Sequence, residues 1–142
     1  MSLNTSIKWI HPTNFDGNYS TGPGFRKVIL HLTGICTTIG ANYDEDSVIK
    51  LDISELRTPT GAVCTRTVVE KIKWTVDGFK NASLYWDRSP NDIIAVLPAG
   101  HGKSHGDLVD NCDGGGSGNI VLSTIGAMDG AAYDITISIR LK

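Results

Sequence analysis

The sequence lacks long apolar runs and segments with a helical period. No run of about eighteen apolar residues is present, so no helix able to span a membrane is expected. The start, MSLNTSIKWIH, has no basic region followed by an apolar stretch, so export through a signal peptide is not expected. Because no stretch of about ten residues repeats apolar side chains at the helical spacing, we expect a chain without helices.

Paired cysteines and an excess of one charge are also missing. Cys36, Cys64 and Cys112 are odd in number, far apart and without a CxxC pair, so neither a disulfide framework nor a zinc knuckle is predicted. Free thiols are typical of a reducing cytoplasm. A net charge of -2 offers no basic field to nucleic acid and no polybasic segment to an anionic membrane. Neither partner is therefore expected.

Catalytic signatures are absent as well. The sequence contains no GxSxG elbow, no HExxH pair and no serine or cysteine in an activating context. Gly102-Lys103-Ser104 is similar to the end of a phosphate-binding loop, but the glycine required five positions before Gly102 is replaced by Leu97. We therefore predict neither an enzyme nor a nucleotide cofactor.

A metal site can be considered at His101, His105 and Asp107, whose imidazole and carboxylate groups suit zinc or nickel. These residues lie in the glycine-rich stretch 98–119, which we interpret as a long, polar surface loop. Histidines four residues apart converge on one ion on a helix, and no helix is expected here. The sequence therefore predicts no metal.

What the sequence does contain is strict alternation of apolar and polar residues. It is clearest in residues 130–142, GAAYDITISIRLK, where apolar side chains occupy every second position from Tyr133 to Leu141. Strand side chains point alternately to opposite faces, so this segment is predicted to be a strand with one buried face. Further strands are predicted at 6–11, 25–32, 46–53, 63–76, 82–86, 93–97 and 120–125.

The number and spacing of these strands predict an all-β fold, a single-domain antiparallel β-sandwich or jelly roll. Residues 1–24 are expected to form an extended N-terminal arm and residues 25–142 the β-sandwich domain. The strand at 25–32 is expected to be covered on both faces, and the strand at 46–53 to bury Ile49 and expose Lys50.

Two further expectations concern the middle of the chain. Asp77-Gly78 predicts a bulged, three-residue hairpin. A loop with an odd number of residues keeps the apolar side chains of the two flanking strands on the same face of the sheet. With a loop of this length, Trp74 and Trp86 are both expected to face the core, and each indole N–H then needs a hydrogen-bond partner.

The second half of the chain carries a resemblance to a known class of proteins. Its features are the tryptophan strand IKWTV, the WDR turn, the GSGNIVLST strand and the final AYDITISIRLK strand. In these features residues 65–142 resemble small β-sandwich virion structural proteins of tailed bacteriophages.

The resemblance implies a non-enzymatic virion protein that is made in the host cytoplasm and contacts the major capsid protein or other virion proteins. Within this class we favour a capsid decoration (cement) protein. Such a protein binds and stabilises the outer shell as a homo-oligomer, for which a trimer is favoured. A neck, tail-adaptor or fibre-associated protein is the alternative. A glycan-binding module on the virion surface is a further alternative.

Two groups of side chains are candidates for these contacts. If trimer-related subunits meet through the arm, its apolar residues are expected in that interface, namely Ile7, Trp9, Ile10 and Phe15. A glycan site is expected to use residues near the WDR turn and in the polar stretch, namely Tyr85, Arg88, His101 and His105.

Overall fold

The structure is a computed structural model. It describes residues 3–11, 27–36, 44–53, 56, 67–88, 90–109, 116–128 and 130–141. The described residues form seven strands and no α-helix, which confirms the all-β prediction. The strands are β1 (Leu3–His11), β2 (Lys27–Cys36), β3 (Val48–Leu51), β4 (Thr67–Trp86), β5 (Asp92–Val109), β6 (Ile120–Ile125) and β7 (Ala132–Leu141).

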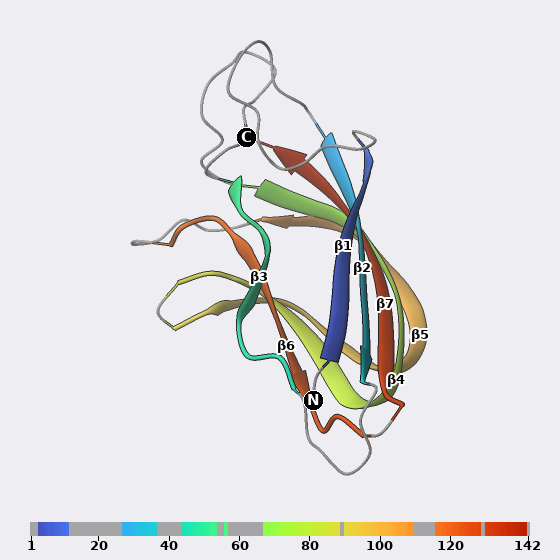
Figure 1. The fold of residues 1–142 in the computed structure, drawn as a ribbon. Helices are drawn as coiled ribbons and strands as arrows, with labels where there is room; N and C mark the ends of the chain where they lie inside the picture. Colours follow the sequence, from blue (N-terminus) through green and yellow to red (C-terminus); the bar gives the residue numbers. More distant parts are fainter. Residues whose placement is uncertain are drawn as a thin grey trace.

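The seven strands form one antiparallel sheet in the order β1-β2-β7-β4-β6-β3, with β5 paired to β4. Along one edge of β4, residues 67–77 pair with β7 and residues 81–86 pair with β6. The long strands β4 and β5 thus belong to both halves of the sheet, and Figure 1 shows them curving from the β1-β2-β7 side to the β3-β6 side. The result is a nearly closed, barrel-like sheet.

The core lies between the two halves of this sheet. β7 pairs with β2 along one edge and with β4 along the other, and the apolar side chains from Tyr133 to Leu141 are all buried. They pack in one cluster with apolar residues of the other strands, such as Leu30, Leu84 and Leu122. The alternation in residues 130–142 therefore predicted both the strand and its buried face correctly.

The hairpin predicted at Asp77-Gly78 is wrong. β4 continues through both residues, and the pairing with β5 is irregular between Val76 and Asn81 instead. Gly78 has a φ of 78°, a left-handed conformation that glycine adopts at low cost, and an added Cβ would lie 2.7 Å from the Ala131 Cα. Here the glycine bends the strand from one half of the sheet to the other.

The surface loop predicted over residues 98–119 is also wrong for the most part. β5 extends to Val109 and pairs with β4 over almost its whole length. Glycines weaken a strand but do not forbid it, and the neighbouring β4 supplies the hydrogen bonds. Residues 110–115 lie outside the described residues.

Two predicted strand faces differ from the structure. β2 is buried on one face only, because its alternate residues are buried and partly exposed in turn. In β3 a register shift between Ile49 and Leu51 changes the expected pattern at two residues, so that Lys50 is buried and Ile49 is exposed, whereas Leu51 and Ile53 are buried as predicted. A β-bulge changes which side of the sheet a residue faces, and the residue types of Ile49 and Lys50 do not predict a bulge.

The N-terminal residues take part in the sheet. β1 pairs with β2 as an edge strand, and Trp9 packs against the core opposite Leu30. Residues 12–26, which include Phe15, lie outside the described residues. The two tryptophans of β4 differ: Trp86 is buried and its Nε1 donates to Thr67 Oγ1 at 3.4 Å, whereas Trp74 is only partly buried.

Candidate functional site

The most distinctive surface of the described residues is the outer side of β2, β7, β4 and β5. Three open hollows adjoin one another there, with volumes of about 390, 250 and 370 Å³. Thr75 lines all three, and Lys73 and Asp134 each line two of them. The surface is therefore broad and shallow, and four strands contribute to it.

Two rows of exposed, mostly basic side chains cross this surface. β4 and β5 are in register so that Lys71 faces His105, Lys73 faces Lys103 and Thr75 faces His101. We call these six residues the basic face. Directly opposed residues of antiparallel strands share one side of the sheet and lie about 5 Å apart at their Cβ atoms.

The Lys73–Lys103 pair is electrostatically unfavourable, because like charges placed directly opposite each other destabilise a sheet. Within the described part of the chain, neither ammonium forms an ion pair with a carboxylate. The opposed lysines therefore leave a concentration of positive charge available to an anionic partner.

The nearby carboxylates already have partners. Asp134 Oδ1 lies 2.7 Å from His31 Nε2. Arg140 donates to Glu70 Oε2 at 2.8 Å and to Asp107 Oδ2 at 3.3 Å. Glu70, the polar exception in the alternation of β4, lies where the β4–β7 register shifts, so its carboxylate can reach Arg140. These pairs flank the basic face and do not neutralise its lysines.

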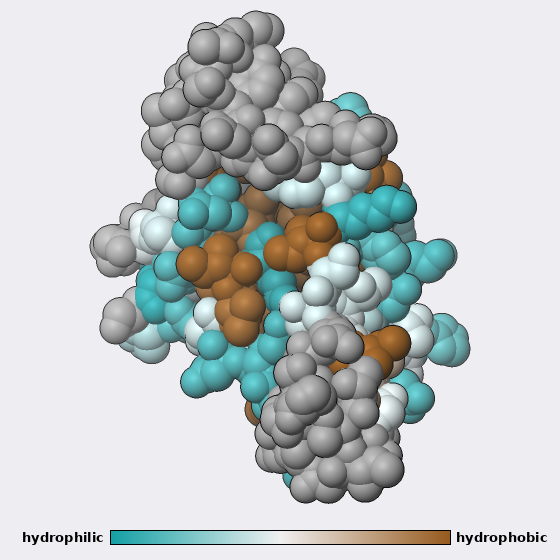
Figure 2. Space-filling view, viewed as in Figure 1, coloured by the Kyte–Doolittle hydropathy of each residue, from teal (hydrophilic) through white to brown (hydrophobic). Residues whose placement is uncertain are grey.

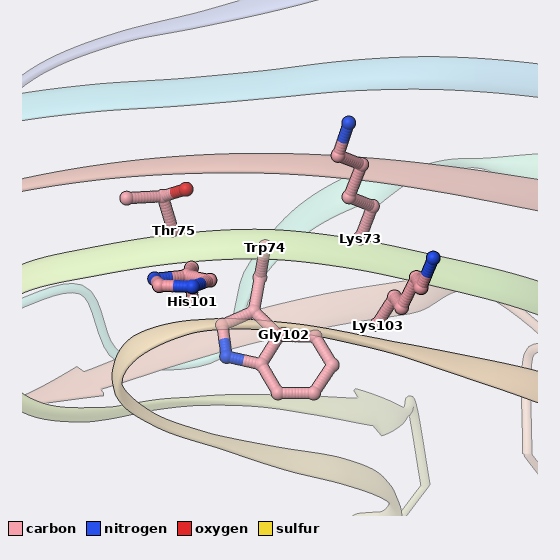
Figure 3. Close-up of a pocket in the computed structure, with 6 residues that line it drawn as sticks. All are labelled: Lys73, Trp74, Thr75, His101, Gly102 and Lys103. Carbon is pink, nitrogen blue, oxygen red and sulfur yellow. The ribbon is translucent and has the colours of Figure 1, made fainter.

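Trp74 lines the largest of these hollows, but its indole ring packs against the core on the face of the sheet opposite to the side chains of Lys73 and Lys103. Its indole ring crosses β5 at Gly102, between His101 and Lys103 (Figure 3). A Cβ added to Gly102 would lie only 2.6 Å from Trp74 Cζ2, so a glycine at this position makes room for the ring. Trp74 Nε1 is buried and, among the described residues, has no hydrogen-bond partner. An unsatisfied buried donor beside a hollow is suited to an incoming acceptor.

His101 and His105 lie on the same side of β5, with Lys103 between them. Alternate residues of a strand share a face, so two histidines four positions apart are separated by about 13 Å, too far to bind one ion together. No group of three metal-ligating side chains is found among the described residues. The structure therefore brings these histidines to the basic face without making a metal centre of them.

Tyr85 and Arg88 lie elsewhere. Tyr85 is half-buried in the second half of β4, where it pairs with Ile93 and Val121, beyond the bend that follows Thr75. Arg88 follows the end of β4, and its backbone N–H donates to Asn91 Oδ1 at 3.2 Å. The structure does not bring these two residues together with His101 into one site.

The apolar candidates of β1 form a separate surface. Ile7 and Ile10 are 41% and 44% exposed, whereas Trp9 packs against the core. At the other end of the strand order, β3 exposes Val48 and Ile49. Figure 2 shows hydrophobic atoms gathered over the region of β1 and β3, which face each other across the opening of the sheet in Figure 1.

Sequence reasoning did not bring Lys71, Lys73 and Lys103 together as one surface. A signal for them was present. His101, Lys103 and His105 repeat with a period of two, as do Lys71, Lys73 and Thr75, and that period is typical of strands. Gly102, between His101 and Lys103, and the neighbouring Gly100 and Gly106 favoured a loop over residues 98–119 instead.

Within the described residues, no helix is long and apolar enough to cross a membrane. The sequence matches no protein-family model, and no curated protein or solved structure is significantly similar to it. The function is therefore inferred from the residues and their geometry.

Proposed function

We propose that this protein is a non-enzymatic structural protein of a tailed-phage virion, and that it decorates and stabilises the outer capsid shell. The observation that supports the proposal best is the broad outer surface of β2, β7, β4 and β5. Sites for small molecules are usually enclosed and concave, whereas protein partners bind across wide, shallow surfaces of this kind. The phage part of the proposal rests on sequence features of residues 65–142 alone, namely the tryptophan strand, the WDR turn and the final alternating strand.

A decoration protein needs no single strong contact. Many copies bind symmetric positions on the shell, and weak contacts gain strength when subunits of one oligomer bind together. The basic face supplies a surface for the major capsid protein, and the exposed apolar residues of β1 supply one for self-association as a trimer. The two functions use different edges of the sheet.

The direct test is to add the purified protein to undecorated capsids. We expect binding at symmetric shell positions, seen by cryo-electron microscopy, and a rise in the temperature at which the shell disassembles. Lys103→Glu is expected to weaken binding, while the same charge change at Lys80, an exposed residue of β4 outside the basic face and outside β1, serves as the control. A protein that neither binds the shell nor stabilises it would contradict the proposal.

A neck, tail-adaptor or fibre-associated position is the alternative within the virion. Copy number separates the two, because a coated shell requires hundreds of subunits and a neck ring about a dozen. Quantifying the protein against the major capsid protein in purified particles gives that number. A dozen copies would favour the neck and hundreds the shell.

A glycan-binding module is the second candidate, and the hollow beside Trp74 is the observation that favours it. An indole face with a free N–H can stack on a sugar ring and donate to one of its hydroxyls. Since Tyr85 lies beyond the bend, the sugar would contact Trp74 and His101. Trp74→Ala should then abolish retention on a glycan array, and Tyr85→Ala should not.

A further inference from the structure

One edge of β5 has no strand partner among the described residues. Among the described strands β5 pairs only with β4, and from Pro98 to Val109 its residues are exposed or half-buried on both faces. Of the strands that the structure describes, none besides β4 pairs with this stretch. An uncovered edge strand presents unpaired N–H and C=O groups that can pair with an added strand.

The basic side chains beside this edge determine which kind of added strand binds best. His101, Lys103 and His105 project from β5 itself, and Lys73 stands directly opposite Lys103. A second copy of β5 is disfavoured because its own basic side chains would meet these. An acidic strand is favoured, because each carboxylate would relieve the repulsion between the two lysines.

Trp74 and Gly102 add a position for one side chain of the incoming strand. The hollow at Gly102 has a volume of about 390 Å³, and the Trp74 indole forms part of its lining. Figure 3 shows that this hollow adjoins β5 between His101 and Lys103. The unsatisfied Nε1 of Trp74 provides a donor for a carbonyl or carboxylate oxygen there.

From these three features we infer that this edge of β5 binds an extended acidic segment of a partner protein as an additional strand. Backbone hydrogen bonds to residues 98–109 hold the segment, its carboxylates lie beside Lys103 and the two histidines of β5, with Lys73 one strand further away, and one of its residues occupies the hollow at Trp74. This inference goes beyond the proposed function, since the isolated protein would bind such a segment whatever particle it belongs to.

The experiment uses the full chain and three synthetic peptides of about ten residues, long enough to follow this edge of β5. The first alternates valine and glutamate. The second alternates valine and lysine. The third repeats the first but carries N-methyl groups on alternate peptide nitrogens, which keeps its charge and removes half of its backbone donors. Fluorescence anisotropy measures affinity, and hydrogen exchange measures protection of the backbone amides of β5.

The acidic peptide is expected to bind at least about tenfold more tightly than the other two, and to protect amides between residues 98 and 109. Added salt should weaken this binding. Lys103→Glu should weaken it by about tenfold, whereas Lys8→Glu, the same charge change on the opposite edge strand, should leave it unchanged. Trp74→Phe retains an aromatic ring without the N–H and should bind less tightly than the parent.

Four results would overturn the inference. The first is no binding of the acidic peptide, and the second is binding of the acidic peptide no tighter than that of the basic peptide. Equal binding of the N-methylated peptide would show attraction by charge without strand addition. Protection of β1 amides in place of β5 amides would assign the binding to the other edge of the sheet.

Discussion

The Tyr133 hydroxyl donates a 2.6 Å hydrogen bond to Glu45 Oε2 inside the hydrophobic core. The other carboxylate oxygen of Glu45, Oε1, lies 2.7 Å from Lys50 Nζ, and this ammonium lies 5.9 Å from the centroid of the Tyr133 ring. Thr124 accepts the backbone N–H of Glu45 at 2.9 Å through its Oγ1. A charge buried this deeply persists only with partners, so Glu45 and Lys50 depend on each other.

Lys50→Met is expected to lower the free energy of unfolding by about 3–5 kcal/mol, because it leaves the buried Glu45 carboxylate without its countercharge. Urea unfolding at neutral pH measures the loss. Replacing both members of the pair, as Glu45→Leu with Lys50→Met, should recover a large part of it, since no buried charge then remains. If the single and double variants were equally unstable, the loss would come from packing and not from charge.

Stability at high pH should depend on Tyr133. Burial is the largest of the effects that raise the pKa of the Tyr133 phenol above its usual value. The hydrogen bond to Glu45 and the negative charge of the Glu45 carboxylate raise this pKa further. Above about pH 10 the unfolded chain loses this proton while the folded chain keeps it, so stability should fall by about 1.4 kcal/mol per pH unit. Below that pH the contribution is intact.

The check is to compare the parent with Tyr133→Phe by denaturant unfolding between about pH 8 and 11. At pH 8 the variant should be less stable, because Glu45 loses a hydrogen bond in the core. Since phenylalanine does not ionise, the difference between the two proteins should narrow as the pH rises past 10. Curves that stay parallel over this range would contradict the role given to Tyr133.

Two glycines that face aromatic rings should respond differently to alanine. A Cβ at Gly34 would collide with the ring of Tyr133, which is buried and held by Glu45, so Gly34→Ala should cost about 1–3 kcal/mol. A Cβ at Gly102 would meet Trp74, which is partly buried beside a hollow and can move. Gly102→Ala should therefore cost less and shift the tryptophan fluorescence. Equal losses in thermal unfolding would refute this contrast.

Some features of this fold could be predicted from local sequence. The final strand was predicted correctly because alternation alone decides which of its residues face the core, and Tyr133 and Ile137 fulfil that pattern. The strand at Ile120–Ile125 and the reversal between Trp86 and Asp92 were found for similarly local reasons, an apolar run in the first case and turn residues in the second.

Other features depend on partners distant in the chain. Asp77-Gly78 is compatible with a hairpin and with a bend in a continuous strand. The bend forms because β4 pairs with β7 before these residues and with β6 after them. Lys50 looks like a surface residue until the β3 bulge turns it toward Glu45. Likewise, the opposition of Lys73 and Lys103 follows from the β4–β5 register, which neither strand specifies alone.

The basic face should lower the stability of the free protein. Lys103→Glu replaces a repulsive cross-strand pair with an attractive one, so the free energy of unfolding should rise by about 0.5–1 kcal/mol. The gain should shrink in high salt, because these side chains are exposed and their interaction is screened. Thermal unfolding at low and high salt measures both effects, and Lys8→Glu is the control. A stability unchanged at low salt would contradict the repulsion.

The exposed apolar residues of β1 should support self-association if the protein is a trimer as proposed. Ile10 is 44% exposed on this edge strand, so Ile10→Ser should reduce the contact between subunits while leaving the fold intact. Light scattering coupled to size exclusion should show the trimer of the parent shifting toward monomer. Ile93→Ser, at a residue that is 58% exposed on β5, is the matched control and should remain trimeric. A monomeric parent, or an Ile10→Ser variant that assembles like the parent, would remove β1 from the interface.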